Sequence, residues 1–295
     1  MRVLVLGADG MLGHKAFQVL SERFYVQAGF RARKGLWQQY PIFKGVKRDR
    51  IFTGIDAMDF KTLIQVFKKA GPDVVINCIG IIKQVKETEN PLINITVNSL
   101  FPHQLAEFCV AKKIRMFHMS TDCVFSGKKG NYAEEDFADA PDLYGRTKFL
   151  GEVNRPGCFT LRTSLIGRDF AKKVSLLEWF LGQEGKKIRG FTRAIYTGLT
   201  TQALAKIIRD LISDFPDIWG VYQVASQPIT KYDLLVKIRD AMKLNIEIEP
   251  FDGVSKNLSL NASRFIKATG YKIPSWDEMI EELKLDKASY NERSV

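Results

Sequence analysis

The sequence predicts an α/β fold with a doubly wound parallel sheet and a smaller, partly interleaved C-terminal lobe. Two observations support this prediction. In the first half of the chain, short apolar runs rich in Val and Ile alternate with amphipathic stretches, which is typical of a parallel sheet covered by helices on both faces. The first of these runs leads directly into a glycine-rich turn, as in nucleotide-binding α/β proteins.

The expected elements follow one another in a regular order. Apolar runs predict the strands, and helical periodicity predicts the helices between them. After about residue 163 this rhythm changes, and a late strand is expected to return to the main sheet. The helices that follow it flank a region that reads as mostly loop. The predicted strands are 3–6, 24–30, 73–78, 114–119, 158–161 and 221–224, and the predicted helices are 11–22, 59–70, 91–111, 142–153, 200–214, 230–243 and 275–283.

The length and this change of rhythm predict the domain organisation. At 295 residues, the chain is long enough for one large α/β domain with a smaller lobe. We expect residues 1–163 to form a nucleotide-binding domain of the Rossmann type, to which residues 196–226 return. Residues 164–195 and 227–295 are then expected to form the smaller lobe, which would bind the substrate.

The charge of the chain favours an anionic partner. The net charge is +11, from 44 Lys and Arg against 33 Asp and Glu, and such an excess attracts phosphorylated molecules. The basic residues are spread widely, without a long cationic run or a nucleic-acid-binding motif. We therefore expect phosphorylated small molecules as partners, and not nucleic acid.

Cysteine and histidine usage argues against a metal site. The four cysteines are widely separated, without a C-x-x-C pair, and the chain has only three histidines. Free, mostly buried thiols suit a reducing compartment.

No segment is apolar over the length that a membrane span requires, and the apolar run at the N-terminus is too short for a signal peptide. We expect a cytoplasmic protein with neither a bound metal nor a membrane partner.

The first strand runs into a loop suited to a dinucleotide. Glycines at 7, 10 and 13 follow the strand and lead into a helix beginning near Met11. Glycine allows the backbone to approach a pyrophosphate closely, and the helix N-terminus offers free N–H groups. The spacing is G-x-x-G-x-x-G. The residues expected to bind the cofactor here are Gly7, Asp9, Gly10, Met11, Leu12 and Gly13.

The end of the second predicted strand favours NADPH over NADH. An acidic residue at this point would bind the ribose hydroxyls of NAD, but the chain has no Asp or Glu between Glu22 and Asp49. Arg31, Arg33 and Lys34 cluster there instead, and guanidinium groups bind phosphate well. They are expected to meet the 2′-phosphate of NADPH. The alternative is a solvated loop with no ligand.

A tyrosine and a lysine four residues apart predict a proton-transfer pair. Tyr144 and Lys148 lie within a predicted helix, so that they share one face. A nearby ammonium favours the phenolate and would lower the pKa of the phenol, which suits it to donate a proton near neutral pH. The alternative is a surface lysine beside a half-buried tyrosine.

These motifs together resemble a known superfamily. The three glycines followed by Tyr144-x-x-x-Lys148 resemble the short-chain dehydrogenase/reductases, and the chain length resembles their extended, nucleotide-sugar branch. The run MSTDCVFSG at 119–127, followed by Tyr132-x-Glu134 and YGRTK at 144–148, is especially similar to the dTDP-4-dehydrorhamnose reductase family. The resemblance covers most of the chain and is strongest over residues 1–163.

The resemblance implies catalytic roles. Thr121 would hold the carbonyl oxygen of the substrate, and Tyr144 would donate a proton as hydride arrives from the nicotinamide. Lys148 would bind the nicotinamide ribose and tune Tyr144. Asn98 matches the position that supports a water relay to the lysine, with a helix-face asparagine as the alternative.

The resemblance also implies further contacts. Asp56, just before the helix predicted over 59–70, matches an adenine-contacting aspartate of the family. The nearby Asp59 is the alternative interpretation of this acidic segment, in which the aspartate caps the helix. Asn77 and Gly80 follow the fourth strand of the family fold, where the loop lies along the cofactor. The residues after Thr121 are expected at the substrate. The substrate-binding residues are then Asp122 and Cys123, and Arg162, Arg193 and Lys231 are compatible with either the substrate diphosphate or surface ion pairs.

The expected reaction is reduction of a sugar ketone. Related 4,6-dehydratases place an Asp-Glu pair after the threonine, whereas Asp122 is followed by Cys123, and elimination needs both an acid and a base. The first hypothesis is therefore NADPH-dependent reduction of the C4 ketone of a nucleoside-diphosphate 4-keto-6-deoxysugar, dTDP-linked or UDP-N-acetylated. The alternatives are a nucleotide-sugar epimerase and a non-catalytic regulatory subunit like methionine adenosyltransferase β. A homodimer is compatible with the resemblance.

Overall fold

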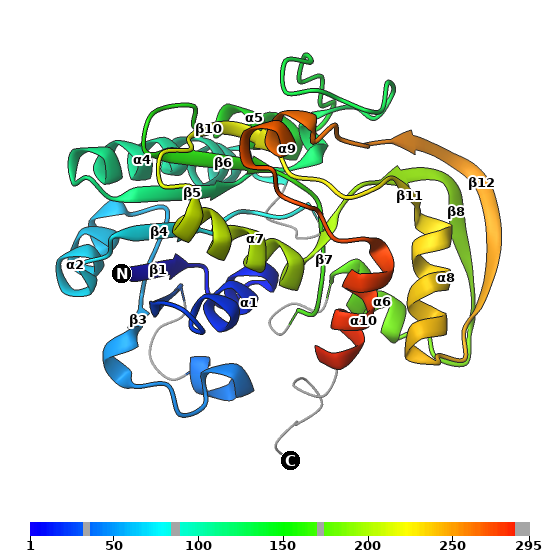
Figure 1. Ribbon diagram of the computed structural model, residues 1–295, viewed down its shortest axis with the longest axis horizontal. Helices are drawn as coiled ribbons and strands as arrows, with labels where there is room; N and C mark the ends of the chain where they lie inside the picture. Colours follow the sequence, from blue (N-terminus) through cyan, green and yellow to red (C-terminus); the bar gives the residue numbers. More distant parts are fainter. Residues whose placement is uncertain (32–35, 84–88, 170–173, 287–295) are drawn as a thin grey trace.

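Seven parallel strands form the central sheet in the computed structural model of the chain, which describes residues 1–31, 36–83, 89–169 and 174–286. Their spatial order is β10-β6-β5-β4-β1-β2-β3 (Figure 1). The order changes direction between β1 and β4, where Rossmann-type sheets bind their ligands. The predicted Rossmann-type fold is confirmed. The strands are β1 (Arg2–Leu6), β2 (Tyr25–Phe30), β3 (Ile51–Thr53), β4 (Val74–Asn77), β5 (Arg115–Met119), β6 (Cys158–Arg162) and β10 (Gly220–Gln223).

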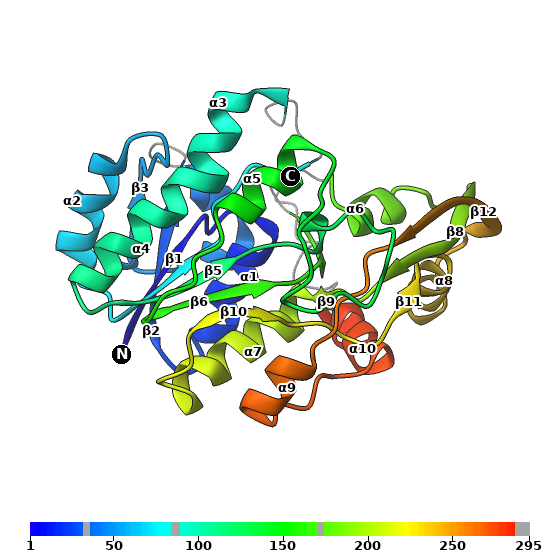
Figure 2. The same ribbon diagram turned by 90° about the horizontal axis from the view of Figure 1, so that it is seen from above.

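Helices cover both faces of this sheet (Figure 2). In β1, Val3 and Val5 face the core shared with α1 and α7, whereas Leu4 and Leu6 face the core shared with α2 and α4. All four side chains are fully buried, and this two-sided burial explains why the strands are continuously apolar. The helices of this part are α1 (Met11–Leu20), α2 (Phe60–Ala70), α3 (Pro91–Asn94), α4 (Phe101–Ala111), α5 (Leu143–Leu150) and α7 (Thr201–Asp214).

A second, three-stranded sheet of order β11-β8-β12 lies beyond the carboxyl ends of the central strands (Figure 1). β12 runs parallel to β8, with an irregularity between Phe251 and Ser255, and β11 runs antiparallel to β8. A short parallel pair joins β7, which precedes β8 in the sequence, to β9, which follows it. The elements are β7 (Leu165–Ile166), α6 (Leu176–Leu181), β8 (Lys187–Tyr196), β9 (Leu199–Thr200), β11 (Ile229–Thr230), α8 (Lys231–Met242), β12 (Glu247–Asn257), α9 (Ser263–Thr269) and α10 (Trp276–Asp286).

The two sheets are joined at several points of the chain. As predicted, the strand after α7 returns to the central sheet, where β10 pairs with β6. After β12, an isolated bridge joins Leu260 to Tyr132. At the far end, Asp286 of α10 forms an ion pair with Lys15 of α1, 2.7 Å between Oδ2 and Nζ. The proposed division into a nucleotide-binding domain and a substrate lobe stays a prediction.

The chain is helical throughout the predicted 91–111, but the sequence did not show that its turn Ile95–Leu100 is a π-helix between α3 and α4. Pro102 has no N–H, so the carbonyl of Asn98, four residues earlier, lacks its α-helical donor. The region predicted as loop contains β12, the longest strand described. In β12 the alternation of apolar and polar residues is broken by Pro250 and Gly253, and most of its side chains are exposed. The strand therefore contains no apolar run that would predict it.

Candidate active site

The glycine loop after β1 has the geometry of a phosphate cradle. Gly7 has φ +73°, and its N–H and that of Ala8 both donate to the carbonyl of Gly29, 3.0 Å away in each case. A Cβ on Gly13 would lie 2.0 Å from the carbonyl oxygen of Gly7, so α1 packs directly on the loop. Gly10 is the N-cap of α1, and no acidic residue lies in the first turn. The loop therefore fits a pyrophosphate at the helix N-terminus.

The other residues expected in this loop lie between Gly7 and Gly13. Leu12 is buried in the first turn of α1, and Asp9 and Met11 are partly exposed. Arg31 is exposed directly after β2, while Arg33 and Lys34 lie outside the described residues.

Two aspartates before α2 have different bonding. The carboxylate of Asp56 accepts from the N–H of Met58 at 2.9 Å. The carboxylate of Asp59 accepts from the N–H of Lys61 at 3.1 Å and caps α2. The capping role weighed for Asp59 is therefore confirmed, whereas an adenine contact by Asp56 stays a prediction.

Thr121 lies just beyond the carboxyl end of β5. Its hydroxyl accepts from the N–H of Cys123 at 3.1 Å and donates to Oδ1 of Asp122 at 3.2 Å. The residue is 7% exposed. The threonine hydroxyl is thus held in one orientation at the edge of the sheet where the glycine loop also lies.

Helix α5 carries Tyr144 and Lys148 and is fixed at both ends. Asp142 caps it by accepting from the N–H of Gly145 at 2.8 Å. A Cβ on Gly145 would lie 2.1 Å from the carbonyl oxygen of Cys123, and one on Gly151 would lie 1.8 Å from that of Asn98. Helix α5 is therefore pressed against both the loop that follows Thr121 and the π-helix.

Lys148 is almost fully buried, at 6% exposure. Its ammonium donates to the carbonyl of Met119 at 2.6 Å. Burial lowers the pKa of Lys148 to about 8, and the nearby Glu152 carboxylate opposes that shift. A Cβ on Gly80 would lie 4.0 Å from Nζ, so the loop after β4 passes close to the ammonium.

The electrostatics of Tyr144 differ from the sequence-based expectation. Burial raises the pKa of Tyr144 well above its ordinary value, and Cys123 acts in the same direction. The Thr121 hydroxyl is close enough to act as a hydrogen-bonding neighbour that lowers this pKa. The predicted lowering of the pKa is wrong here, because burial is the largest cause of the shift and outweighs the neighbour that lowers it. A phenol that keeps its proton is still a proton donor.

The polar side chains of Asn77 and Asn98 shape the loop after β4. Asn77 is fully buried and accepts from the N–H of Ile79 at 3.1 Å. Asn98 accepts from the N–H of Ile81 at 2.9 Å and donates to its carbonyl at 3.2 Å. The Asn98 amide is therefore occupied by the backbone of this loop, and the expected support of a water relay stays a prediction.

The two residues expected at the substrate, Asp122 and Cys123, directly follow Thr121 in the sequence. Asp122 is 2% exposed. Burial raises its pKa, while hydrogen-bonding neighbours such as Ser164 lower it. The thiol of Cys123 is partly buried, and burial raises its pKa to about 12. Asp122 accepts from the Thr121 hydroxyl, and the expected contacts of both residues with the substrate stay predictions.

Comparison with known proteins places this geometry in a family. The model of the RmlD substrate binding domain matches residues 1–286. The chain belongs to the RmlD substrate-binding domain family. It is 27% identical over 256 residues to dTDP-4-dehydrorhamnose reductase of Aggregatibacter actinomycetemcomitans, which covers 81% of this chain and 78% of that protein. It is 25% identical over 258 residues to methionine adenosyltransferase 2 subunit beta of Xenopus tropicalis, with 82% and 72% covered.

A solved structure shares the fold of this RmlD-family chain almost end to end. The dTDP-4-dehydrorhamnose reductase of Bacillus anthracis, solved in complex with NADP, superposes with a TM-score of 0.77 at 19% identity, covering 97% of this chain and 99% of that one.

Within the described residues, no helix is long and apolar enough to cross a membrane. Among the same residues there is no group of three or more His, Cys, Asp or Glu that could hold a metal ion.

Sequence reasoning missed Glu152, a buried residue beside this RmlD-family site. Arg162 and Glu152 form a buried ion pair behind α5, 2.7 Å between Nη2 and Oε2, so Arg162 is neither a surface ion pair nor free for a diphosphate. Arg193 is exposed on β8, and Lys231 is close enough to lower the pKa of Asp122. The four-residue spacing of Lys148 and Glu152 was the available signal, but the partner on β6 is distant in sequence.

Tyr196, at the end of β8, was also missed. Its residue is 7% exposed, and its hydroxyl has no hydrogen-bond partner among the described residues. Burial raises its pKa, as does the nearby Asp122. Ser164 is close enough to affect the phenol but makes no hydrogen bond to it. Apolar neighbours, including Trp276 at 5.7 Å between ring centroids, surround the ring.

We expect Tyr196→Phe to leave the free energy of unfolding unchanged or to raise it. A buried hydroxyl without a partner costs about 1–3 kcal/mol, so its removal loses no bond. The matched control is Tyr271→Phe, because the Tyr271 hydroxyl donates to Asp210 at 3.1 Å, and we expect a loss of about 1 kcal/mol there. Urea unfolding of both variants measures the difference. A larger loss for Tyr196→Phe than for the control would show that the hydroxyl is bonded in solution.

Proposed function

We propose that the protein is an NADPH-dependent reductase of the C4 ketone of a nucleoside-diphosphate 4-keto-6-deoxysugar. One observation carries the proposal. The hydroxyl of Thr121, the phenol of Tyr144 and the ammonium of Lys148 come together at the carboxyl end of β5, on the side of the sheet where the glycine loop forms its cradle. A proton donor, a carbonyl-binding hydroxyl and a nucleotide site are the groups that ketone reduction by hydride transfer requires.

In this proposal, one set of residues binds the cofactor and another acts on the sugar ketone. The glycine loop with Asp9, the 31–34 segment, Asp56, Asn77 and Gly80 would hold the dinucleotide. When bound, the dinucleotide supplies the hydride that reaches C4 of the sugar. Thr121 holds the carbonyl oxygen, and Tyr144 gives that oxygen its proton, so that the ketone becomes a hydroxyl. Lys148 holds the nicotinamide ribose with its charge, and Asp122 orients Thr121 through the bond between their side chains.

Proton donation from Tyr144 is compatible with its high pKa. A phenol whose pKa is raised by desolvation does not hold a negative charge well alone, so the transfer needs a nearby positive charge while the proton leaves. Lys148, one helical turn away, is the cation on the same face of α5. The single carboxylate after Thr121 supports reduction over 4,6-dehydration, which needs a second acid–base group.

The cofactor preference is a separate prediction. We expect replacement of both Arg31 and Arg33 by Ala to weaken NADPH binding by about 10- to 100-fold, the value of one or two charge-assisted hydrogen bonds. NADH binding should change little, because NADH lacks the 2′-phosphate. Fluorescence titration of both cofactors against wild type and variant measures this. Equal losses for NADH and NADPH would contradict a 2′-phosphate site. The NADP bound in the B. anthracis relative supports the preference.

The proposed reaction is tested by absorbance of the reduced nicotinamide. Enzymatically prepared dTDP- and UDP-linked 4-keto-6-deoxysugars are supplied with NADPH, and the product sugar is identified by NMR. We expect one equivalent of NADPH to be consumed per ketone reduced. Conversion of a nucleotide sugar without net NADPH consumption would indicate the epimerase alternative, in which the cofactor is recycled.

A regulatory role is the second candidate, favoured by the relatives named methionine adenosyltransferase 2 subunit beta. A protein with that role would bind NADPH without turnover and would co-purify with a catalytic subunit. The assembled Thr121, Tyr144 and Lys148 set supports the reductase instead, since a binding subunit needs no proton donor. The ketosugar assay separates the two candidates.

Two further parts of the proposal concern organisation. The sheet β11-β8-β12 with α8 would form the lobe that binds the sugar nucleotide, because it stands beyond the carboxyl ends of β5 and β6 (Figure 2). A homodimer is also proposed, on a face where large apolar side chains are exposed along α3, the π-helix and α5. These side chains are Leu92, Ile95, Leu100, Phe149 and Leu150.

A further inference from the structure

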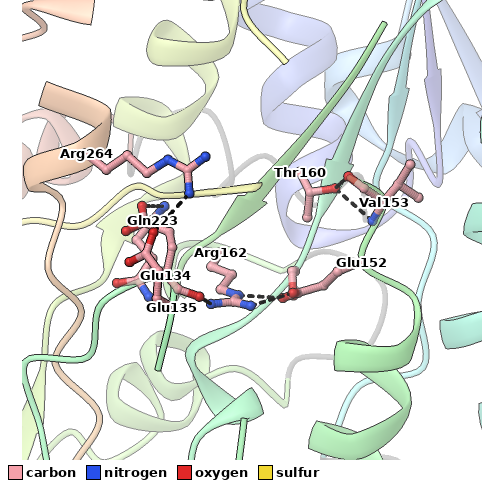
Figure 3. A network of polar contacts seen from close by, with 9 residues as sticks. Glu134, Glu135, Glu152, Val153, Thr160, Arg162, Gln223 and Arg264 are labelled. Carbon is pink, nitrogen blue, oxygen red and sulfur yellow. Dashed lines mark hydrogen bonds and ion pairs between the residues drawn. The ribbon is translucent and has the colours of Figure 1, made fainter. Parts of the chain in front are cut away.

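The carboxylate of Glu152 is the centre of a buried polar network (Figure 3). Arg162 binds it with two hydrogen bonds, from Nε at 2.8 Å and from Nη2 at 2.7 Å. The hydroxyl of Ser120 donates to the same carboxylate at 2.6 Å. The Glu152 and Arg162 side chains are each 5% exposed. The guanidinium also donates to the carbonyl of Glu134 at 3.1 Å, so each of its three nitrogens makes a hydrogen bond within the protein.

This network joins the end of β6 to the two elements that carry the proposed catalytic residues, the loop after β5 and helix α5. Ser120 follows β5 and directly precedes Thr121, Arg162 ends β6, and Glu152 follows α5. The N–H of Ser120 also donates to the carbonyl of Leu161 at 2.7 Å. The backbone N–H and the side-chain hydroxyl of Ser120 are therefore both hydrogen-bonded. These two bonds fix the position of the backbone directly before Thr121.

Glu152 also acts on Lys148, four residues earlier. Besides the neutral Tyr144 phenol on the same face of α5, the titratable groups that interact with the Lys148 ammonium are the Cys78 thiol after β4, the His118 ring of β5 and the Glu152 carboxylate. Burial keeps the thiol and the imidazole uncharged, since it raises the pKa of Cys78 to about 12 and lowers that of His118 far below its ordinary value. Glu152 is therefore the one charged acid among these three.

We propose that Glu152 is a positioning residue of the active site, which fixes Thr121 through Ser120 and balances the charge of Lys148 from behind. The inference rests on the proposed function, because it assigns Lys148 to the nicotinamide ribose. Arg162 neutralises much of the carboxylate charge and holds it in place, so the two partners together set how strongly Lys148 keeps its proton. Removal of the Glu152 charge alone takes away the carboxylate that favours the protonated form of the buried Lys148.

The test is the pH dependence of NADPH affinity, measured by fluorescence between pH 7 and 10 without any sugar. This range lies above the titration of the 2′-phosphate, near pH 6. In wild type, affinity should fall as Lys148 loses its proton, around its pKa of about 8. In Glu152→Gln, which keeps the shape of the side chain, we expect this loss to begin about 1 pH unit lower.

Two further variants separate the parts of the inference. Ser120→Ala removes only the hydroxyl that Glu152 accepts, so we expect kcat to fall roughly threefold to tenfold, with the pH dependence of NADPH affinity unchanged. Glu178→Gln is the matched control, because it breaks the ion pair between Arg168 and Glu178, 2.6 Å apart, whose side chains are 13% and 10% exposed. It should lose stability without moving the pH dependence.

The outcomes distinguish the inference from the proposed function. If wild type shows no loss of NADPH affinity between pH 7 and 10, the assignment of Lys148 to the cofactor fails. If wild type shows the loss and Glu152→Gln shows it at the same pH, the Glu152 inference is overturned while the assignment of Lys148 stands. If Glu152→Gln does not fold, Ser120→Ala decides: an unchanged kcat would overturn the positioning role.

Discussion

Tyr144→Phe is expected to abolish most ketone reduction while NADPH still binds. The change removes the hydroxyl and keeps the ring, so the packing of α5 is preserved. Loss of a positioned general acid typically costs about 10²- to 10⁴-fold in rate, and we expect kcat to fall by that factor. The measurement is NADPH oxidation with the ketosugar, together with a fluorescence titration of NADPH alone.

The control for this variant is Tyr132→Phe, in the loop after Thr121. The Tyr132 hydroxyl accepts from the N–H groups of Gly127 and Lys129, each at 3.1 Å, so it is bonded to backbone and away from the proposed chemistry. It should reduce stability by about 1 kcal/mol and leave most of kcat intact. Wild-type rates in Tyr144→Phe would remove the assigned proton donor, whatever the control does.

Gly13→Ala is expected to destroy the cofactor cradle. A Cβ at this position would lie 2.0 Å from the carbonyl oxygen of Gly7 and 2.9 Å from Cα of Ala8. Both contacts are to backbone, so α1 must move away from the loop. We expect a loss of about 1–3 kcal/mol in the free energy of unfolding and at least a tenfold loss of NADPH affinity, which corresponds to about 1.4 kcal/mol.

Gly182→Ala serves as the matched glycine control. Gly182 caps α6 with φ −77°, and a Cβ there would meet its nearest atom, the carbonyl oxygen of Trp179, at 3.4 Å. The stability of this variant should stay within about 0.5 kcal/mol of wild type. If Gly13→Ala bound NADPH as tightly as Gly182→Ala does, the loop would not be the pyrophosphate site.

Most of the central sheet was predictable from the sequence because its strands are apolar and largely buried, whereas β3, a three-residue edge strand with two partly exposed residues, was not predicted. The run from Val3 to Leu6 is apolar at every position, and the glycines after it are required by contacts that only a missing Cβ allows. The same applies to α5, where Asp142 supplies the cap and Gly145 the close approach to Cys123. Signals of this kind are local, so a single sequence contains them.

The parts that were not predicted depend on distant partners. β12 is recognisable only with β8 beside it, because many of its residues are exposed. The π-helix depends on Pro102 and on the contact of Gly151 with the Asn98 carbonyl. The pKa of Tyr144 was mispredicted for a similar reason, because four-residue spacing indicates a shared helical face but says nothing about burial, which raises this pKa.

The return of β10 to the central sheet limits how the protein can be divided. The chain leaves that sheet after β6, builds β8, comes back with α7 and β10, and leaves again for β11 and β12. A fragment that ended near residue 163 would lack β10 and would expose one side of β6 as an unpaired edge. It would also lose the stacking of Tyr222 on Phe159, whose ring centroids are 5.0 Å apart. Heating should therefore unfold both sheets in a single calorimetric transition.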